Sequence, residues 1–345
     1  MQKKLIALAV AGLVSAPAFA QSNVTIYGLV DMGFSYRGDN FVDGVGSQTR
    51  IDSGIANGSR LGFRGTEDLG NGLKAGFVLE QGLFADRGVS AQDGRTFGRQ
   101  SYVSLGGGFG EVRVGRQYTP QNMIHGAYDP FGDGTVGKVS NVYAQTANGR
   151  LDNSVAYISP SFSGLNVLVA YSTQAEGQEN VDNDGDLQVW AISPMYSNGP
   201  LSLAANYHKV DEKSGTYENK VWDLAAAYDF GVAKVSAMYG NSEWDEVGGS
   251  EEADYWSVGL TVPVGAAGKV LASYTSAKYD DSVDSAKANQ WALGYTHNLS
   301  KRTDVYAVYA DIDNKDDVLI ATSGDATNGG DGYQKGFNVG VRHRF

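Results

Sequence analysis

The chain has 345 residues, no cysteine and a formal net charge of −12, from 39 acidic and 27 basic residues. An acidic chain is not expected to bind nucleic acid, and a chain without cysteine forms no disulfides. After the first 20 residues there is no run of 18 apolar residues. This excludes a helical membrane protein but not a barrel, whose strands need only about ten alternating residues.

The first 20 residues predict a secretory signal peptide. They begin with a pair of lysines, continue with an apolar run of about ten residues, and end with Ala-Phe-Ala, which fits a cleavage site. We therefore expect residues 1–20 to be removed and residues 21–345 to form one barrel domain.

Segments in which apolar and polar residues alternate fill the rest of the chain. Such alternation is typical of a strand with one apolar face and one polar face. In chain order the sixteen predicted strands are 23–36, 59–69, 73–84, 97–106, 111–117, 150–160, 165–175, 186–197, 201–209, 219–229, 232–243, 253–263, 268–279, 287–298, 303–314 and 332–345. The last strand ends at Phe345, which we expect to help close the barrel against the first strand.

The connections between these strands alternate between short turns and long polar loops. Short turns include 70–72, 106–108 and 197–200, whereas 37–58 and 315–331 are long and polar. This layout predicts an all-β fold, a 16-stranded antiparallel transmembrane β-barrel with short periplasmic turns and long extracellular loops. It also predicts the bacterial outer membrane as the location.

One connection, residues 118–149, is out of scale and shows no sustained alternation. A segment of this length without regular structure is expected to be functional or disordered. It cannot lie against lipid, because its backbone groups would lack hydrogen-bond partners there. We therefore expect this third extracellular loop to fold inward and narrow the pore.

Several stretches, in order along the chain, resemble the trimeric general porins of beta-proteobacteria. They are 24–31, 59–75, 109–116, 298–303 and 339–345. The resemblance implies a sixteen-stranded homotrimer with an inward third loop. It also implies outer-membrane lipid and lipopolysaccharide as partners, and small hydrophilic solutes and ions as cargo.

In each predicted strand the apolar residues mark the face that points to lipid. Charged residues on the opposite face are therefore expected to reach the lumen. The side chains with lumen parity are Arg60, Arg64, Lys74, Glu80, Glu111 and Arg113. Arg113 and Arg116 cannot both face the lumen of a regular strand.

Anion-selective members of the resembled family carry an arginine ladder at the constriction, with a glutamate nearby. The resemblance places these groups at Arg60, Arg99, Arg150 and Glu80. Parity alone turns Arg99 outward, although a bulge near the loop end of its strand can re-aim it. Asp129 and Asp133 of the inward loop are the acids expected to offset the ladder.

These features predict a water-filled channel for passive diffusion, with a preference for anions. A cation-preferring or substrate-selective porin, a barrel adhesin and a barrel enzyme remain alternatives. No cofactor or metal is expected, since the four histidines are far apart and the Asp-rich segment 182–186 lacks the glutamate of a calcium loop.

Overall fold

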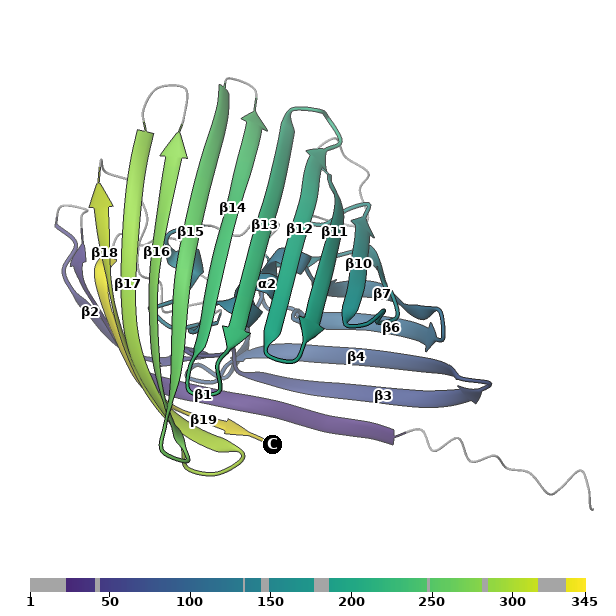
Figure 1. Cartoon of the computed structure of the whole chain (residues 1–345), viewed down its shortest axis with the longest axis horizontal. Coiled ribbons are helices and arrows are strands. Elements are labelled where there is room, and N and C mark those ends of the chain that lie inside the picture. Colours follow the sequence, from purple (N-terminus) through teal and green to yellow (C-terminus); the bar gives the residue numbers. More distant parts are fainter. Residues whose placement is uncertain are drawn as a thin grey trace, which may run out of the picture.

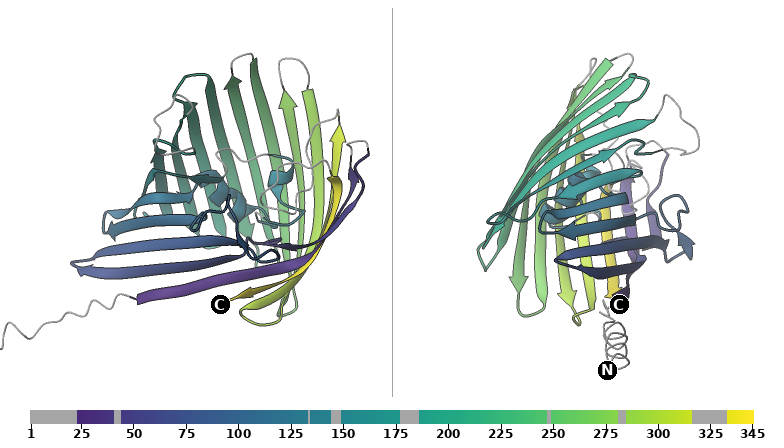
Figure 2. Two further views of the ribbon diagram at one scale, coloured as in Figure 1. Left: turned by 180° about the vertical axis from the view of Figure 1, so that it is seen from behind. Right: turned by 90° about the vertical axis from the view of Figure 1, so that its right-hand side faces the viewer.

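The computed structural model describes residues 23–40, 44–132, 134–143, 149–176, 186–246, 249–280, 285–315 and 333–345. Residues 1–20 and Asp133 lie outside this part of the chain. The described residues form one antiparallel sheet that closes on itself, because β1 pairs with β19 (Figures 1 and 2). Within them, no helix is long and apolar enough to cross a membrane.

Sixteen strands form the wall, as the alternation predicts. They are β1 (Asn23–Asn40), β3 (Arg60–Gly70), β4 (Leu73–Phe84), β6 (Gln100–Gly107), β7 (Gly110–Tyr118), β9 (Ser154–Ile158), β10 (Leu165–Ser172), β11 (Leu187–Asn198), β12 (Leu201–Glu212), β13 (Tyr217–Asp229), β14 (Lys234–Glu246), β15 (Gly249–Val264), β16 (Gly268–Asp280), β17 (Ser285–Asn298), β18 (Thr303–Lys315) and β19 (Tyr333–Arg344). Three short strands add to it: β2 (Gln48–Ser53), β5 (Val89–Ser90) and β8 (Arg150–Leu151). The predicted strand 150–160 is thus split between β8 and β9.

The outer wall carries paired aromatic rings on four consecutive hairpins, each with a tryptophan on one strand and a tyrosine on the next. Their ring centroids are 5.1–5.3 Å apart, in the pairs Trp190–Tyr207, Trp222–Tyr239, Trp256–Tyr274 and Trp291–Tyr309. Aromatic rings favour the membrane–water interface, where an apolar body and a polar tip are both satisfied.

The third loop folds into the barrel, as predicted, but it is not structureless. It contains the helix α2 (Pro120–Tyr128) and the short 3₁₀ helix η1 (Val139–Asn141) (Figure 1). The Thr119 hydroxyl oxygen accepts a hydrogen bond from the Asn122 N–H at 3.2 Å, and Pro120 occupies the first helical position. Both are helix-start signals, so the Thr-Pro pair marked this helix in the sequence.

The loop packs against the lumen face of the wall formed by β12–β18. Ile124, Tyr128 and Tyr143 lie in one buried cluster with small wall residues such as Ala225 and Ala253. At Gly259 a side chain would leave no space, because its Cβ would lie 2.4 Å from Cγ of Pro130 in the loop. Small residues on the inner wall therefore make room for the loop.

Candidate pore constriction

Arginine side chains converge on one glutamate opposite the inward loop. Arg99 donates from Nε to Oε1 of Glu80 at 2.8 Å, and Arg60 Nη1 lies 3.9 Å from the same oxygen. Tyr27 donates to the other carboxylate oxygen at 2.9 Å. Glu80 is only 3% exposed, and each of its carboxylate oxygens accepts a hydrogen bond from one of these partners.

The third arginine joins this group through an aromatic ring. Tyr118 at the end of β7 accepts a hydrogen bond from Nη2 of Arg99 at 2.5 Å. Arg150 on β8 pairs in register with Tyr118, and its guanidinium carbon lies 4.7 Å from the centroid of that ring. The structure thus brings together all four residues of the expected ladder. Three positive charges face one negative charge.

Arg99 lies on the lumen side although its parity favours the lipid side. It is the residue before β6, so strand alternation does not fix its direction. Gly58 supplies the space, since a Cβ there would lie 2.7 Å from Nη1 of Arg99. The carbonyl oxygen of Gly58 also accepts a hydrogen bond from Nε of Arg60 at 2.9 Å.

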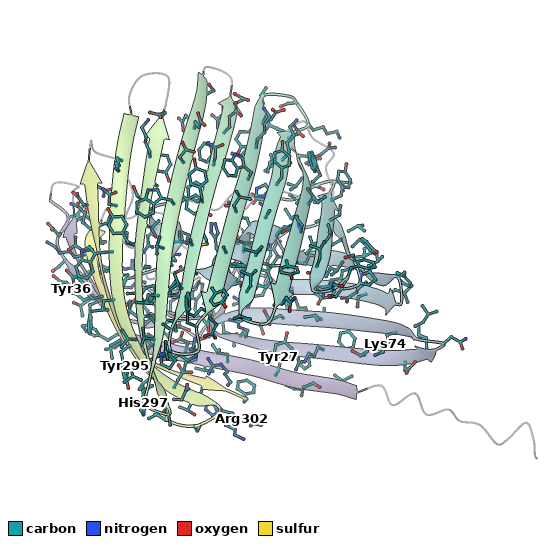
Figure 3. All side chains as sticks on the ribbon, in the orientation of Figure 1. Tyr27, Tyr36, Lys74, Tyr295, His297 and Arg302 are labelled. Atoms are coloured by element: carbon teal, nitrogen blue, oxygen red, sulfur yellow. The ribbon has the colours of Figure 1, made fainter. Side chains whose placement is uncertain are left out.

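The other charges with lumen parity lie nearer the short turns. Arg64 stacks over the Tyr27 ring at 5.1 Å, and Arg113 forms a 2.9 Å ion pair with Glu111. Lys74 projects near the tip of the β3–β4 hairpin, away from the arginine group (Figure 3). These four groups are spread along the wall, and Glu111 already offsets Arg113.

Asp129 follows α2 but does not present a free carboxylate to the pore. One of its oxygens accepts the Phe131 N–H at 3.0 Å and the other accepts the Val139 N–H at 2.9 Å. It is 6% exposed, so its charge serves mainly to shape the loop. Asp133, the second expected acid, is not among the described residues.

A second inward element, the turn 54–59, was not expected from the sequence. The buried Asp31 of β1 accepts the N–H groups of Ala56 and Asn57 at 2.7 Å each, and the Tyr306 hydroxyl donates to it at 2.6 Å. Ile55 and Ala56 pack in a cluster with Phe131 of the third loop. The sequence signal for this turn was Asp31, a charged residue within the predicted first strand.

A buried polar network anchors α2 to the wall. Asp223 of β13 accepts hydrogen bonds from Tyr255 at 2.8 Å and Asn206 at 3.0 Å, and Nε2 of His125 lies 3.5 Å from it. The Tyr143 ring stacks on Tyr255 with centroids 3.9 Å apart. Burial raises the pKa of the Tyr143 hydroxyl well above its usual value, so this loop residue stays neutral.

A profile of Gram-negative porins matches residues 7–317 of the chain. The chain belongs to this family. Among curated relatives, "Outer membrane porin protein 32" of Delftia acidovorans is 37% identical over 281 residues, which is 78% of each chain. An outer membrane porin protein of Bordetella pertussis is 34% identical, over 77% of this chain and 74% of that one.

Solved structures agree with this assignment. A structure titled "Anion-selective porin from Comamonas acidovorans" matches with a TM-score of 0.82 and 35% identity, over 94% of this chain and 100% of that one. The trimer form of OmpT from Vibrio cholerae matches with a TM-score of 0.75 at 20% identity, which supports the fold alone. The protein is therefore an outer-membrane porin that forms a water-filled channel for small hydrophilic solutes.

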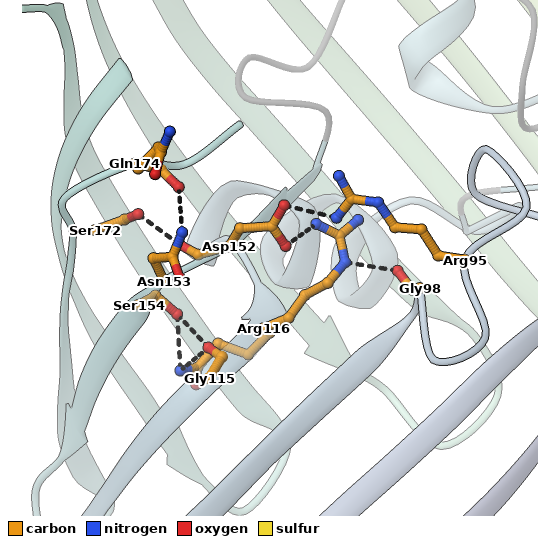
Figure 4. Close-up of polar contacts among 10 residues, drawn as sticks. Arg95, Gly98, Gly115, Arg116, Asp152, Asn153, Ser154, Ser172 and Gln174 are labelled. Carbon is orange, nitrogen blue, oxygen red and sulfur yellow. Dashed lines mark hydrogen bonds and ion pairs between the residues drawn. The ribbon is translucent and has the colours of Figure 1, made fainter. Parts of the chain in front are cut away.

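This porin also carries a charged cluster on the outer face of the barrel, beside β7 and β9 (Figure 4). Asp152 forms 2.6 Å ion pairs with Arg95 and Arg116, and Arg116 also donates to the Gly98 carbonyl at 2.7 Å. Arg116 shares the face of the exposed Val114, so Arg113 alone of the two arginines faces the lumen, as strand parity requires. Charged side chains beside lipid-facing residues are costly unless other polar or protein groups shield them from lipid.

Proposed function

We propose that this porin prefers anions and that Arg60, Arg99 and Arg150 set the preference. The observation that carries the proposal is the excess of guanidinium charge around Glu80, where one carboxylate is shared between Arg99 and Arg60. Arg150 has no share in it and stacks on Tyr118 instead. The net charge of this group is positive, so it lowers the energy of an anion that sheds part of its water.

Passage is passive under this proposal. An arginine holds its charge at every physiological pH, and its planar group donates several hydrogen bonds at once. The group formed with Tyr118 fixes two guanidiniums, so an anion meets donors whose positions are already set. The 35% identical structure titled an anion-selective porin supports this assignment.

We also propose a homotrimer in contact with outer-membrane lipid and lipopolysaccharide, and a cleaved signal peptide at residues 1–20. The outer face beside β7 and β9 supports the homotrimer, because the cluster of Arg95, Asp152 and Arg116 lies beside the exposed side chains of Val114 and Val155. A neighbouring subunit would cover these charges and exclude them from lipid.

The reversal potential across a planar bilayer in a salt gradient tests the anion preference. Wild type is compared with Arg60→Ala, Arg99→Ala and Arg150→Ala, and with Arg302→Ala in an exposed turn as the control. We expect an anion-sign potential in wild type, and a chloride-to-potassium permeability ratio about fivefold lower in each ladder variant. A cation-sign potential in wild type would refute the proposal.

A further inference from the structure

The polar network that anchors α2 contains a second buried histidine, His208 of β12. Its side chain is 1% exposed, and it lies on a strand that α2 packs against, since α2 contacts β11–β14 (Figure 1). Nδ1 of the ring lies 3.1 Å from the side-chain nitrogen of Asn206, which is two residues earlier on the same face of the strand. Asn206 also contacts Asp223, so His208 is joined to the anchor of the inward loop.

The carboxylate of Asp223 fixes the direction of the hydrogen bonds around His208. An ionised carboxylate only accepts, so the Asn206 nitrogen that lies 3.0 Å from Oδ2 of Asp223 is the donor of that amide. The same nitrogen faces Nδ1 of His208, which must therefore accept. A ring nitrogen that accepts carries no proton, so His208 is neutral in this arrangement and its proton is on Nε2.

A proton on Nδ1 of His208 is incompatible with this arrangement. The protonated ring presents an N–H group to the amide nitrogen of Asn206, and two donors cannot bond to each other. Turning the amide over would offer the ring Oδ1 of Asn206, which is buried and has no hydrogen-bond partner here, but it would also point Oδ1 at the carboxylate of Asp223. In either case Asp223 loses the hydrogen bond from Asn206, which is the one donor to its Oδ2 among the described residues.

The histidine of α2 differs from His208 in this respect. Nε2 of His125 lies 3.0 Å from the Tyr255 hydroxyl, and that hydroxyl donates its only proton to Oδ1 of Asp223 at 2.8 Å. Nε2 of His125 must therefore be the donor to the hydroxyl. A second proton on the His125 ring goes to Nδ1 and leaves this bond in place, so His208 is the histidine whose protonation breaks the network.

The other groups around His208 do not supply a second negative charge. Asp223 of β13 and His125 of α2 are the charged or chargeable groups that act on the ring, and its register partners on β11 and β13 are an alanine and a valine. The stacked phenols of Tyr143 and Tyr255 lie beyond them and are uncharged in neutral and acid solution. A charged His208 is therefore better accommodated in water than in this buried position.

We infer that His208 and Asn206 form an acid-operated release for the inward loop, in which protonation of His208 withdraws Asn206 from Asp223 and frees α2 from the wall. Once α2 leaves, the ring on the lumen face of β12 meets water and keeps its proton. The released state thus binds more protons than the anchored state, so a fall in pH shifts the population toward release. The inference does not depend on the anion preference proposed above, because separate residues carry it.

Single-channel recordings of the full-length mature protein at about pH 7.5 and about pH 4.5 test this release. We expect closures of the wild-type channel to become about tenfold more frequent in acid, because a loop that leaves the wall crosses the lumen. His208→Asn keeps an acceptor near the position of Nδ1 but takes up no proton, so its closures should stay as rare in acid as at neutral pH. His125→Gln keeps a donor toward Tyr255 and should retain the acid response. The matched control is His297→Gln at the short-turn end of β17, outside the network, which should respond as wild type does.

A spin label on α2 gives a second measurement that does not depend on the charges of the pore. The chain has no cysteine, and a Cβ at Gly126 of α2 meets nothing within 4 Å, so Gly126→Cys adds one thiol without crowding. The label should gain mobility in acid in the otherwise wild-type protein and not in the protein that also carries His208→Asn. The inference is overturned if acid leaves the label in the otherwise wild-type protein as it is at neutral pH, or if closures increase equally in His208→Asn. It is also overturned if His125→Gln, and not His208→Asn, abolishes the acid response.

Discussion

Arg99 and Glu80 form a 2.8 Å ion pair that joins the residue before β6 to the middle of β4. Both side chains are more than nine-tenths buried, yet Arg60 and Tyr27 also contact the same carboxylate. Glu80 therefore has two roles that oppose each other. It fixes the position of the arginines, and it removes part of their charge from the pore.

The variant Glu80→Gln separates these roles. A glutamine side chain has a similar shape and still accepts hydrogen bonds, so Arg99 keeps a partner while the negative charge is lost. We expect the chloride-to-potassium permeability ratio to rise about threefold, because one opposing charge leaves the constriction. The measurement is the reversal potential in a salt gradient.

Glu243→Gln is the control for that charge change, because Glu243 is an exposed acid at the loop end of β14. It should leave the permeability ratio at the wild-type value. A lower ratio in Glu80→Gln would contradict the prediction. It would mean that ordering of the arginines matters more than their net charge.

The anchor of α2 gives a second prediction. Asp223→Ala removes the acceptor shared by Tyr255 and Asn206 and leaves His125 without its nearby carboxylate. Buried donors without partners are costly, so the free energy of unfolding should fall by about 3 kcal/mol. The inward loop should also move more, which single-channel recordings would show as larger fluctuations of the open current.

Asp211→Ala provides the comparison, since Asp211 forms an ion pair with the half-buried Lys209 at the loop end of β12. Its effect on unfolding should be below about 1 kcal/mol, as for other exposed ion pairs. Equal thermal stability and equal current noise in the two variants would show that the network does not hold the loop.

Most of the barrel was predictable from the sequence because strand alternation has a fixed period and lipid demands a closed sheet. All sixteen wall strands follow from it, and so does the lumen direction of Arg60 and Glu80. The inward course of the third loop followed from its length and its need for hydrogen-bond partners.

The features that strand alternation did not predict lie where the two-residue period of a strand is interrupted. Arg99 precedes its strand, and the 54–59 turn depends on Asp31, which lies more than 20 positions earlier in the chain. The helix α2 interrupts a segment interpreted only by strand rules, although Thr119 and Pro120 marked its start.

The contact between the two inward elements gives a third prediction. A Cβ at Gly134 would lie 2.3 Å from the carbonyl oxygen of Ala56, so the loop and the 54–59 turn meet backbone to backbone there. Gly134→Val should push them apart, lower the free energy of unfolding by about 2 kcal/mol and change the single-channel conductance. Gly126→Ala is the control, because nothing lies within 4 Å of a Cβ at that position. A Gly134→Val protein with wild-type conductance and stability would show that the contact is loose.

The closing seam of the barrel gives the last prediction. Gly28 and Phe345 exchange two backbone hydrogen bonds of 3.1 Å, and the Phe345 ring occupies the space of a Gly28 side chain, since a Cβ at Gly28 would lie 2.2 Å from Cζ of the ring. Gly28→Val should therefore displace the ring and strain the pairing of the first strand with the chain end. We expect the yield of folded barrel on refolding to fall severalfold, measured as the fraction that resists unfolding in detergent until heated.

Deleting Phe345 should lower this yield as well, because it removes the two backbone hydrogen bonds between Gly28 and Phe345 while leaving Gly28 intact. Gly108→Val tests whether any added side chain at a turn glycine has this effect, since a Cβ there meets nothing within 4 Å. If Gly28→Val refolds as well as Gly108→Val, the ring is not required at the seam. If the Phe345 deletion alone lowers the yield, the backbone pairing closes the barrel and the aromatic side chain does not.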